Sequence, residues 1–232
     1  MTEPMTADSH ISQRFDEDLA NLGDNIEAMA ERIMQRFSVA TTPLRSGDPT
    51  DIATILPDDP EVEHLQHVIE EICDLILVRR QPVAGDMRYV VACIRISNDL
   101  ERLHAHTNKI AAAVARISGH DLGELVRHHV LNHTIQLTHE MLQAALQSFK
   151  SGDAEAAKKL QSMDEEVNAS ARVLMRQQLT YMIEKPQMVT SAVEVMVIVR
   201  SIERIGDYAK HIAQLVKYMR LGRDTGQAAF EA

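Results

Sequence analysis

The chain of 232 residues contains one segment twice, and this duplication constrains the fold more than any other feature. The run Arg-Ser-Gly-Asp at residues 45–48 returns 105 residues later as Lys-Ser-Gly-Asp at residues 150–153. The run Asp-Asp-Pro-Glu-Val at residues 58–62 returns at the same distance as Met-Asp-Glu-Glu-Val at residues 163–167. A repeat this long exceeds the periods of solenoid proteins, so it predicts two equivalent bundles in one chain.

Each half has three segments whose apolar residues recur in steps of four and three, which is the spacing of a helical bundle seam. The segment at 62–76 is echoed 105 residues later, the segment at 19–44 is echoed less strictly at 124–149, and the third is echoed 102 residues later. The seam of the third segment consists of Ile96, Leu100, Leu103, Thr107, Ile110, Val114 and Ile117, and that of its copy of Ile198, Ile202, Ile205, Ala209, Ile212, Val216 and Met219.

The composition favours helices, because aromatic residues make up only 3% of the chain and there is no Trp. Each half is long enough to bury a core of its own. We therefore expect an all-α fold, a tandem repeat of two three-helix bundles with six long antiparallel helices. The expected limits are residues 10–118 for the first repeat and 121–220 for the second, with flexible tails at 1–9 and 222–232. Gly47 and Gly152 are predicted as helix C-caps, with Asp48 and Asp153 as the following N-caps and Pro49 in a first turn.

Charge and motif content exclude several classes of function. The net charge of −10 disfavours binding to nucleic acid. The longest apolar run, residues 195–199, is far shorter than the ~20 residues of a membrane span. Two isolated cysteines without C-x-x-C spacing and no leader-like N-terminus make the cytoplasm the expected location. No nucleophile with a matching base and no phosphate-cradling glycine loop is visible, so we expect a binding protein and not an enzyme.

Acidic pairs recur outside the seams. Glu203 and Asp207 are four residues apart on one helix face, and the heptad register turns both away from the seam toward solvent. Asp164 and Asn168 have the same spacing on the preceding helix. Oxygen ligands from neighbouring helices suit hard or borderline metals, although such pairs are also common on solvated helix faces. The counterparts in the first half are Asp59 and Glu63.

Three elements together resemble a known family. They are Ser-Ile-Glu-Arg-Ile-Gly-Asp at residues 201–207, the Arg-Gln-Pro turn that opens residues 80–88, and Asp-x-x-Val-Asn at residues 164–168. With the duplication, they resemble the PhoU family of bacterial phosphate-signalling regulators from about His10 to Tyr218. The resemblance implies paired three-helix bundles whose acidic motifs hold clusters of iron, zinc or another divalent or trivalent metal in some members.

The resemblance also implies a role and partners. The role is negative regulation of phosphate uptake and of the phosphate-starvation response. The partners are the ATPase of the phosphate ABC transporter and the phosphate-sensing histidine kinase, with membrane association only through them and a homodimer as the expected assembly.

The first copy of the motif departs from the family pattern, because it reads Glu-Arg-Leu-His-Ala at residues 101–105 and places Ala105 where the second acid belongs. An imidazole at His104 or His106 is a candidate substitute ligand, although a surface histidine is more often without such a role. The second-half site is therefore preferred. The predicted metal ligands are Glu203, Asp207, Asp164 and Asn168 in the second half, and Glu101, Asp59, Glu63 and His104 in the first.

Two other patterns leave alternatives open. Glu-x-x-His at residues 61–64 and 101–104 matches the motif of di-iron carboxylate bundles, so a di-iron oxidase or a metal-storage protein is the alternative function, although these residues flank the seams. Basic residues recur every seven positions from Arg88 to Arg116, which indicates either a solvated face or a docking stripe for an acidic partner. The predicted partner-binding residues are Arg88, Arg95, Arg102 and Arg204.

Overall fold

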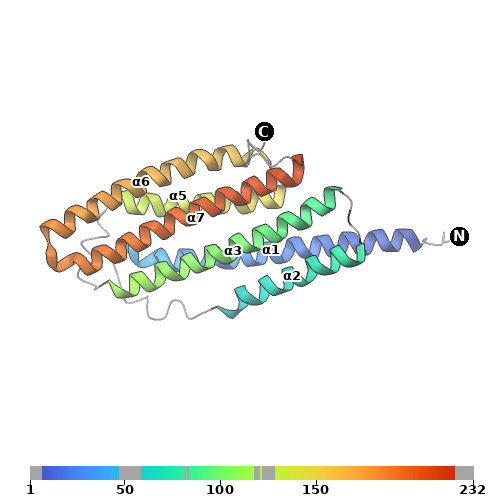
Figure 1. Ribbon diagram of the computed structural model, residues 1–232, viewed down its shortest axis with the longest axis horizontal. Helices are drawn as coiled ribbons and strands as arrows, with labels where there is room; N and C mark the ends of the chain where they lie inside the picture. The colour runs from blue at the N-terminus through green and yellow to red at the C-terminus, as the bar shows by residue number, and fades with distance from the viewer. Residues whose placement is uncertain are drawn as a thin grey trace, which may run out of the picture.

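The computed structural model describes residues 7–46, 59–80, 82, 84–117, 121 and 129–222, with the backbone alone for residues 7–13 and 80. Two sets of three helices lie side by side in an elongated molecule, with α3 and α7 crossing its middle (Figure 1). The predicted all-α tandem repeat is confirmed. The described elements are α1 (Ala7–Ser46), α2 (Pro60–Arg80), α3 (Ala84–Arg116), α5 (His129–Ser151), α6 (Ala156–Glu184), the short 3-10 helix η2 (Pro186–Met188) and α7 (Val189–Leu221).

The predicted seams form the core. Every seam residue of α3 is buried, as is the seam of α7 up to Val216, while Met219 is partly buried. The helices α1 and α5 pack against each other, as do α3 and α7, so one apolar core runs through both repeats. The two bundles are therefore joined along their length and do not have separate cores. None of the described helices has an apolar stretch long enough to cross a membrane.

The turn between α5 and α6 shows why glycine is required there. Gly152 has φ of 67°, and a Cβ at this position would collide with the guanidinium group of Arg220. The carboxylate of Asp153 accepts a hydrogen bond of 2.9 Å from the backbone N–H of Glu155, and the N-cap of α6 is Glu155 itself. The helix thus begins later than predicted, because Asp153 closes a preceding turn. The predicted caps Gly47 and Asp48 and the first-turn Pro49 lie outside the described residues.

The helices α3 and α7 run antiparallel. Asp99 of α3 lies 2.5 Å from His211 Nδ1 of α7, and Arg102 of α3 lies over the ring of Tyr208, 6.0 Å from its centroid. The ring of His106 is also 6.0 Å from that of Tyr208. The two copies of the acidic motif, at 101–105 and 203–207, therefore flank the crossing point of α3 and α7.

An ion pair links the two repeats near the ends of these helices. Arg116 donates two hydrogen bonds, of 2.8 and 2.7 Å, to Glu194, and these bonds lower the pKa of Glu194 although burial opposes them. We expect Glu194→Gln to reduce the free energy of unfolding by about 0.5–1 kcal/mol at pH 7, a small value because the Arg116 side chain is 55% exposed.

The pH dependence of this loss follows from the sign of the shift. A carboxyl with a lowered folded-state pKa stabilises the fold above its unfolded pKa, and the contribution is lost as the pH falls through the folded value. The difference between wild type and Glu194→Gln should be complete at pH 7, begin to shrink near the unfolded pKa of about 4.3, and vanish only below the lowered folded pKa. Urea unfolding over a pH series from 7 downward measures it, and a difference that does not shrink as the pH falls would contradict the assignment.

Candidate functional site at the junction of the repeats

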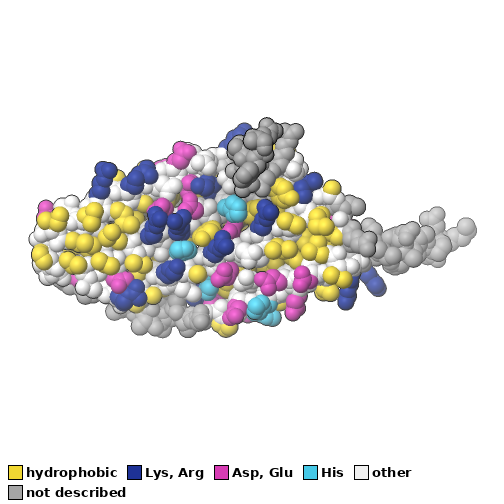
Figure 2. Space-filling view, in the orientation of Figure 1, with side chains coloured by type: hydrophobic (Ala, Val, Ile, Leu, Met, Phe, Trp, Pro, Cys, Tyr) yellow, Lys and Arg dark blue, Asp and Glu magenta, His cyan; other side chains and the backbone are white. Residues whose placement is uncertain are grey.

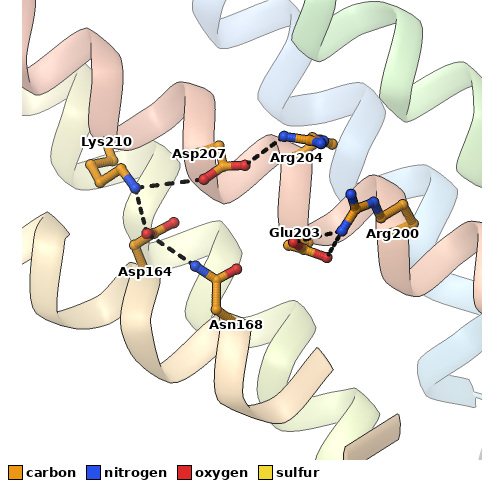
Figure 3. Close-up of polar contacts among 7 residues, drawn as sticks. All are labelled: Asp164, Asn168, Arg200, Glu203, Arg204, Asp207 and Lys210. Carbon is orange, nitrogen blue, oxygen red and sulfur yellow. Dashed lines mark hydrogen bonds and ion pairs between the residues drawn. The ribbon is translucent and has the colours of Figure 1, made fainter. Parts of the chain in front are cut away.

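The second-repeat candidate site lies between α6 and α7 (Figure 3). Asp164 of α6 is only 2% exposed, and its Oδ2 atom lies 2.5 Å from the Nζ atom of Lys210 on α7. Asn168, one turn further along α6, donates a hydrogen bond of 3.2 Å to the same oxygen. Lys210 also lies 3.5 Å from Oδ1 of Asp207, so a single ammonium group joins two of the predicted metal ligands.

The remaining carboxylates of this site have arginine partners on their own helix. Arg200 places one nitrogen 2.8 and 2.7 Å from the two oxygens of Glu203, and Arg204 donates to Asp207 at 3.2 Å. Figure 3 shows these pairs pointing along α7. With Lys210 and Asp164, three carboxylates face three basic groups. The site is therefore balanced in formal charge by residues of the chain itself.

The predicted solvent exposure of Glu203 and Asp207 is only partly correct, because their side chains are 22% and 32% exposed. The prediction used one seam, whereas α7 packs against α3, α5 and α6. A residue that points away from the contact with α3 consequently faces another helix. Sequence reasoning also missed Lys210, although its position three residues after Asp207 would have indicated that the two side chains share a helix face.

In the first repeat, the carboxylate at the position equivalent to Asp164 is Asp59, which is also buried and lies directly before α2. Arg32 of α1 donates two hydrogen bonds to it, of 2.8 and 3.0 Å, and Arg36 of α1 donates one of 3.0 Å. Burial alone would raise the pKa of Asp59, but the bonds and charges of the two arginines outweigh burial and lower it. Asp59 also accepts the backbone N–H of Glu61 at 3.2 Å, so it caps the start of α2.

All four predicted ligands of the first half line one cleft of about 300 Å³ between α2 and α3. Glu63 and Glu101 are exposed, and the Nε2 atom of His104 lies 3.1 Å from the side-chain amide of Asn108. His67 also lines this cleft and was not predicted, although it follows Glu63 by one helical turn. Exposure of Glu101, and likewise of Glu61 and His64, means that the Glu-x-x-His motifs do not point into the core as a di-iron bundle requires.

Neither half is arranged as a metal-ligand cluster. Throughout the described helices, no three His, Cys, Asp or Glu side chains come close enough together to hold a metal ion. The Oδ1 atoms of Asp164 and Asn168 are buried and have no hydrogen-bond partner in the described chain. Each of these oxygens could therefore accept a further hydrogen bond. Lys210, however, already stands between Asp164 and Asp207. As placed, these residues do not fit the cluster that the resemblance implies, and metal binding stays a prediction.

Three of the four predicted partner-binding arginines are exposed on the face formed by α3 and α7. Lys, Arg and His side chains, with Asp and Glu side chains among them, occupy the middle of the face formed by α3 and α7, and hydrophobic side chains lie toward both ends (Figure 2). Arg95 is exposed, and its guanidinium carbon lies 5.9 Å from the centroid of the Tyr218 ring. Arg102 makes the same kind of contact with the ring of Tyr208. Arg204 is also exposed. We call Arg95, Arg102 and Arg204 the basic face.

The rest of the predicted stripe behaves differently. Arg88 is half-buried beside Gly222, and Arg116 is held by Glu194. The pKa of His106 in the middle of the face is lowered. Burial is the larger cause of this shift, and the nearby charges of Lys109 and Arg204 add to it.

These features define a class: duplicated all-α proteins with one acidic motif per repeat at the junction between the repeats. The PhoU domain family matches this chain twice, at residues 19–114 and 131–216, which agrees with the two sets of helices. The chain belongs to the PhoU family.

Relatives align along most of the chain. The chain is 31% identical to the phosphate-specific transport system accessory protein PhoU homolog of Pseudomonas aeruginosa. The alignment covers 93% of this chain and 88% of that protein. The Escherichia coli protein with the name phosphate-specific transport system accessory protein PhoU is 29% identical, over 96% of this chain and 91% of its own.

Solved structures show the same fold. The crystal structure of PhoU from Pseudomonas aeruginosa matches with a TM-score of 0.79 and 26% identity, covering 90% of this chain and all of that one. The structure of the phosphate transport system regulatory protein PhoU from Streptococcus pneumoniae matches with a TM-score of 0.83 at 23% identity, over 92% of this chain.

Proposed function

We propose that this chain is a regulatory accessory protein of a phosphate-specific transport system, which restrains phosphate uptake and the phosphate-starvation response. The observation that carries the proposal is its alignment along nearly its whole length with relatives of that name, with both repeats matched. The protein acts by binding and not by catalysis, in the cytoplasm, and reaches the membrane only through its partners.

The proposed partners are the ATPase of the phosphate ABC transporter and the phosphate-sensing histidine kinase. The basic face supports a docking role, because Arg95 and Arg102 are exposed and lie over tyrosine rings at a cation–π distance that restricts their motion. Charges at the rim of an interface mainly set encounter rate and orientation. A partner surface rich in Asp and Glu would complement this face, and homodimer formation stays a further prediction for sedimentation analysis.

The test is charge reversal on the basic face. We expect Arg95→Glu with Arg102→Glu to weaken binding to the kinase or the ATPase by about tenfold or more, because attraction becomes repulsion at two positions. In cells grown with plentiful phosphate, the double variant should derepress alkaline phosphatase, as deletion of the gene should.

The matched control is Lys158→Glu with Lys159→Glu, which changes the net charge equally on exposed positions of α6. This control should bind and repress as the wild type does. Calorimetry with purified partners measures binding separately from the cellular response. Unchanged binding of the Arg95 and Arg102 variant would remove the docking role of the face, and unchanged repression after gene deletion would remove the regulatory proposal itself.

A further inference from the structure

The two repeats neutralise equivalent buried carboxylates in different ways. Asp59 and Asp164 occupy the same repeat position, 105 residues apart, and are 7% and 2% exposed. In the first repeat the basic partners come from the first helix of the unit, as Arg32 and Arg36 of α1. In the second repeat the partner comes from the last helix of the unit, as Lys210 of α7.

The residues at the exchanged positions confirm that this is a swap. The counterparts of Arg32 and Arg36 on α5 are Leu137 and Met141, which are both buried and uncharged. The counterpart of Lys210 on α3 is Asn108, which accepts a hydrogen bond of 3.0 Å from Arg36. At this pair of equivalent positions, each repeat therefore has a cation for the buried carboxylate and a neutral residue where the other repeat has its cation.

Met141 borders the second-repeat site just as Arg36 borders the first. A Cβ on Gly206 would lie 3.6 Å from the sulfur of Met141 and 3.7 Å from Oδ1 of Asp164, so both side chains face the same point of α7. Because Met141 carries no charge, Lys210 must supply the compensation that a carboxylate with 2% exposure needs.

We infer that Lys210 is the resident cation of the second-repeat site, standing between Asp164 and Asp207 where a metal ion would otherwise bind, so that this half of the chain neutralises its carboxylates without a metal. The ammonium group lies 2.5 and 3.5 Å from the two carboxylates. A divalent cation bridging the same oxygens would come within a few ångströms of it, where like charges repel strongly in protein. Arg200 pairs with the remaining carboxylate, Glu203, and Arg204 is a second partner of Asp207.

The test removes the resident cation and then moves it. The protein is first treated with a chelator and then titrated with Zn²⁺ and, separately, with Mn²⁺. Calorimetry measures metal binding, and thermal unfolding measures stability. We expect Lys210→Asn, which installs the first-repeat residue, to lower the unfolding temperature and to strengthen metal binding at least about tenfold. Metal should then restore the unfolding temperature. Adding Asp164→Asn should abolish the gain in metal binding.

Two further variants separate charge from packing. Met141→Arg combined with Lys210→Asn transplants the first-repeat arrangement, and it should recover the unfolding temperature and lose the metal response. Lys210→Arg should behave as the wild type because it keeps the cation. A merely structural role of the lysine stem would not predict rescue by a residue on a different helix.

The measurements on the otherwise native chain decide the question even if Lys210→Asn fails to fold. Metal binding by the wild type that is lost in Asp207→Asn would overturn the inference. If the wild type binds metal, and this binding is lost in Glu101→Gln but kept in Asp207→Asn, the metal binds in the first-repeat cleft. That outcome supports the inference. A Lys210→Asn variant with wild-type stability and no gain in metal affinity would also overturn it.

Discussion

Phe37→Ala should lower the free energy of unfolding by about 3–5 kcal/mol, the usual loss for a buried aromatic side chain. Phe37 lies in α1, has no solvent exposure and belongs to the core that runs through both repeats. Truncation removes its apolar contacts and leaves a cavity that closely packed helices cannot fill. For a chain of this length, the unfolding temperature should fall by roughly ten degrees. Urea unfolding followed by circular dichroism measures the effect.

The control for this prediction lies two residues away. Val39 is on the same helix with 40% exposure, so Val39→Ala should cost less than about 1 kcal/mol. Because the core is continuous, both repeats should unfold together in Phe37→Ala. A variant within 1 kcal/mol of the wild type, or one in which only the first repeat unfolds, would contradict the description of a shared core.

Arg36→Met should reduce the free energy of unfolding by about 2–3 kcal/mol, because it takes the main buried cation away from a buried carboxylate. The Arg36 side chain is only 11% exposed, and its two terminal nitrogens reach Asp59 and Asn108, each at 3.0 Å. One guanidinium group thus joins α1, the start of α2 and α3. Methionine keeps most of the side-chain volume, so the loss reports the polar contacts.

Arg32→Met is the matched comparison. Arg32 also bonds Asp59, but its side chain is 46% exposed, so water replaces its contribution more easily. We expect the Arg32 variant to lose less than half as much stability as the Arg36 variant. Equal losses in the two variants would mean that burial does not decide the strength of these pairs, and no loss in Arg36→Met would mean that Asp59 is compensated in another way.

Much of the fold could be predicted because the evidence for it is local. The steps of four and three from Ile96 onward identify a helix and its buried side, since the same side chains recur on one face at every turn. Comparison of the copies added the position of the acidic motifs and the unusual Ala105. The start of α6 was predicted too early, because Asp153 forms a turn whose hydrogen bond to Glu155 resembles that of a helix cap.

The candidate site could be predicted only in part. All four first-half residues meet in one cleft, and Asp164, Asn168, Glu203 and Asp207 lie together between α6 and α7, as their repeat positions suggested. The half-burial of Glu203 and Asp207 was missed, because a single seam does not reveal how many helices surround α7. The partners of Asp59 and Asp164 were missed because they come from other helices, whereas Arg200, Arg204 and Lys210 lie three residues from Glu203 or Asp207 on α7 and could have been found from that spacing.

The amino-acid sequence, read through its duplication and periodicity, was sufficient to specify six helices, two equivalent units, the buried seams and the family. These properties depend on neighbours along the chain or on comparison of two copies. Which cation neutralises Asp59 and which neutralises Asp164 was decided by tertiary packing alone. Arg36 is 23 residues from Asp59, and Lys210 is 46 residues from Asp164. These residues come into contact only when α1 packs beside the start of α2 and when α6 packs beside α7. A buried charge is neutralised by a residue of whichever helix packs beside it.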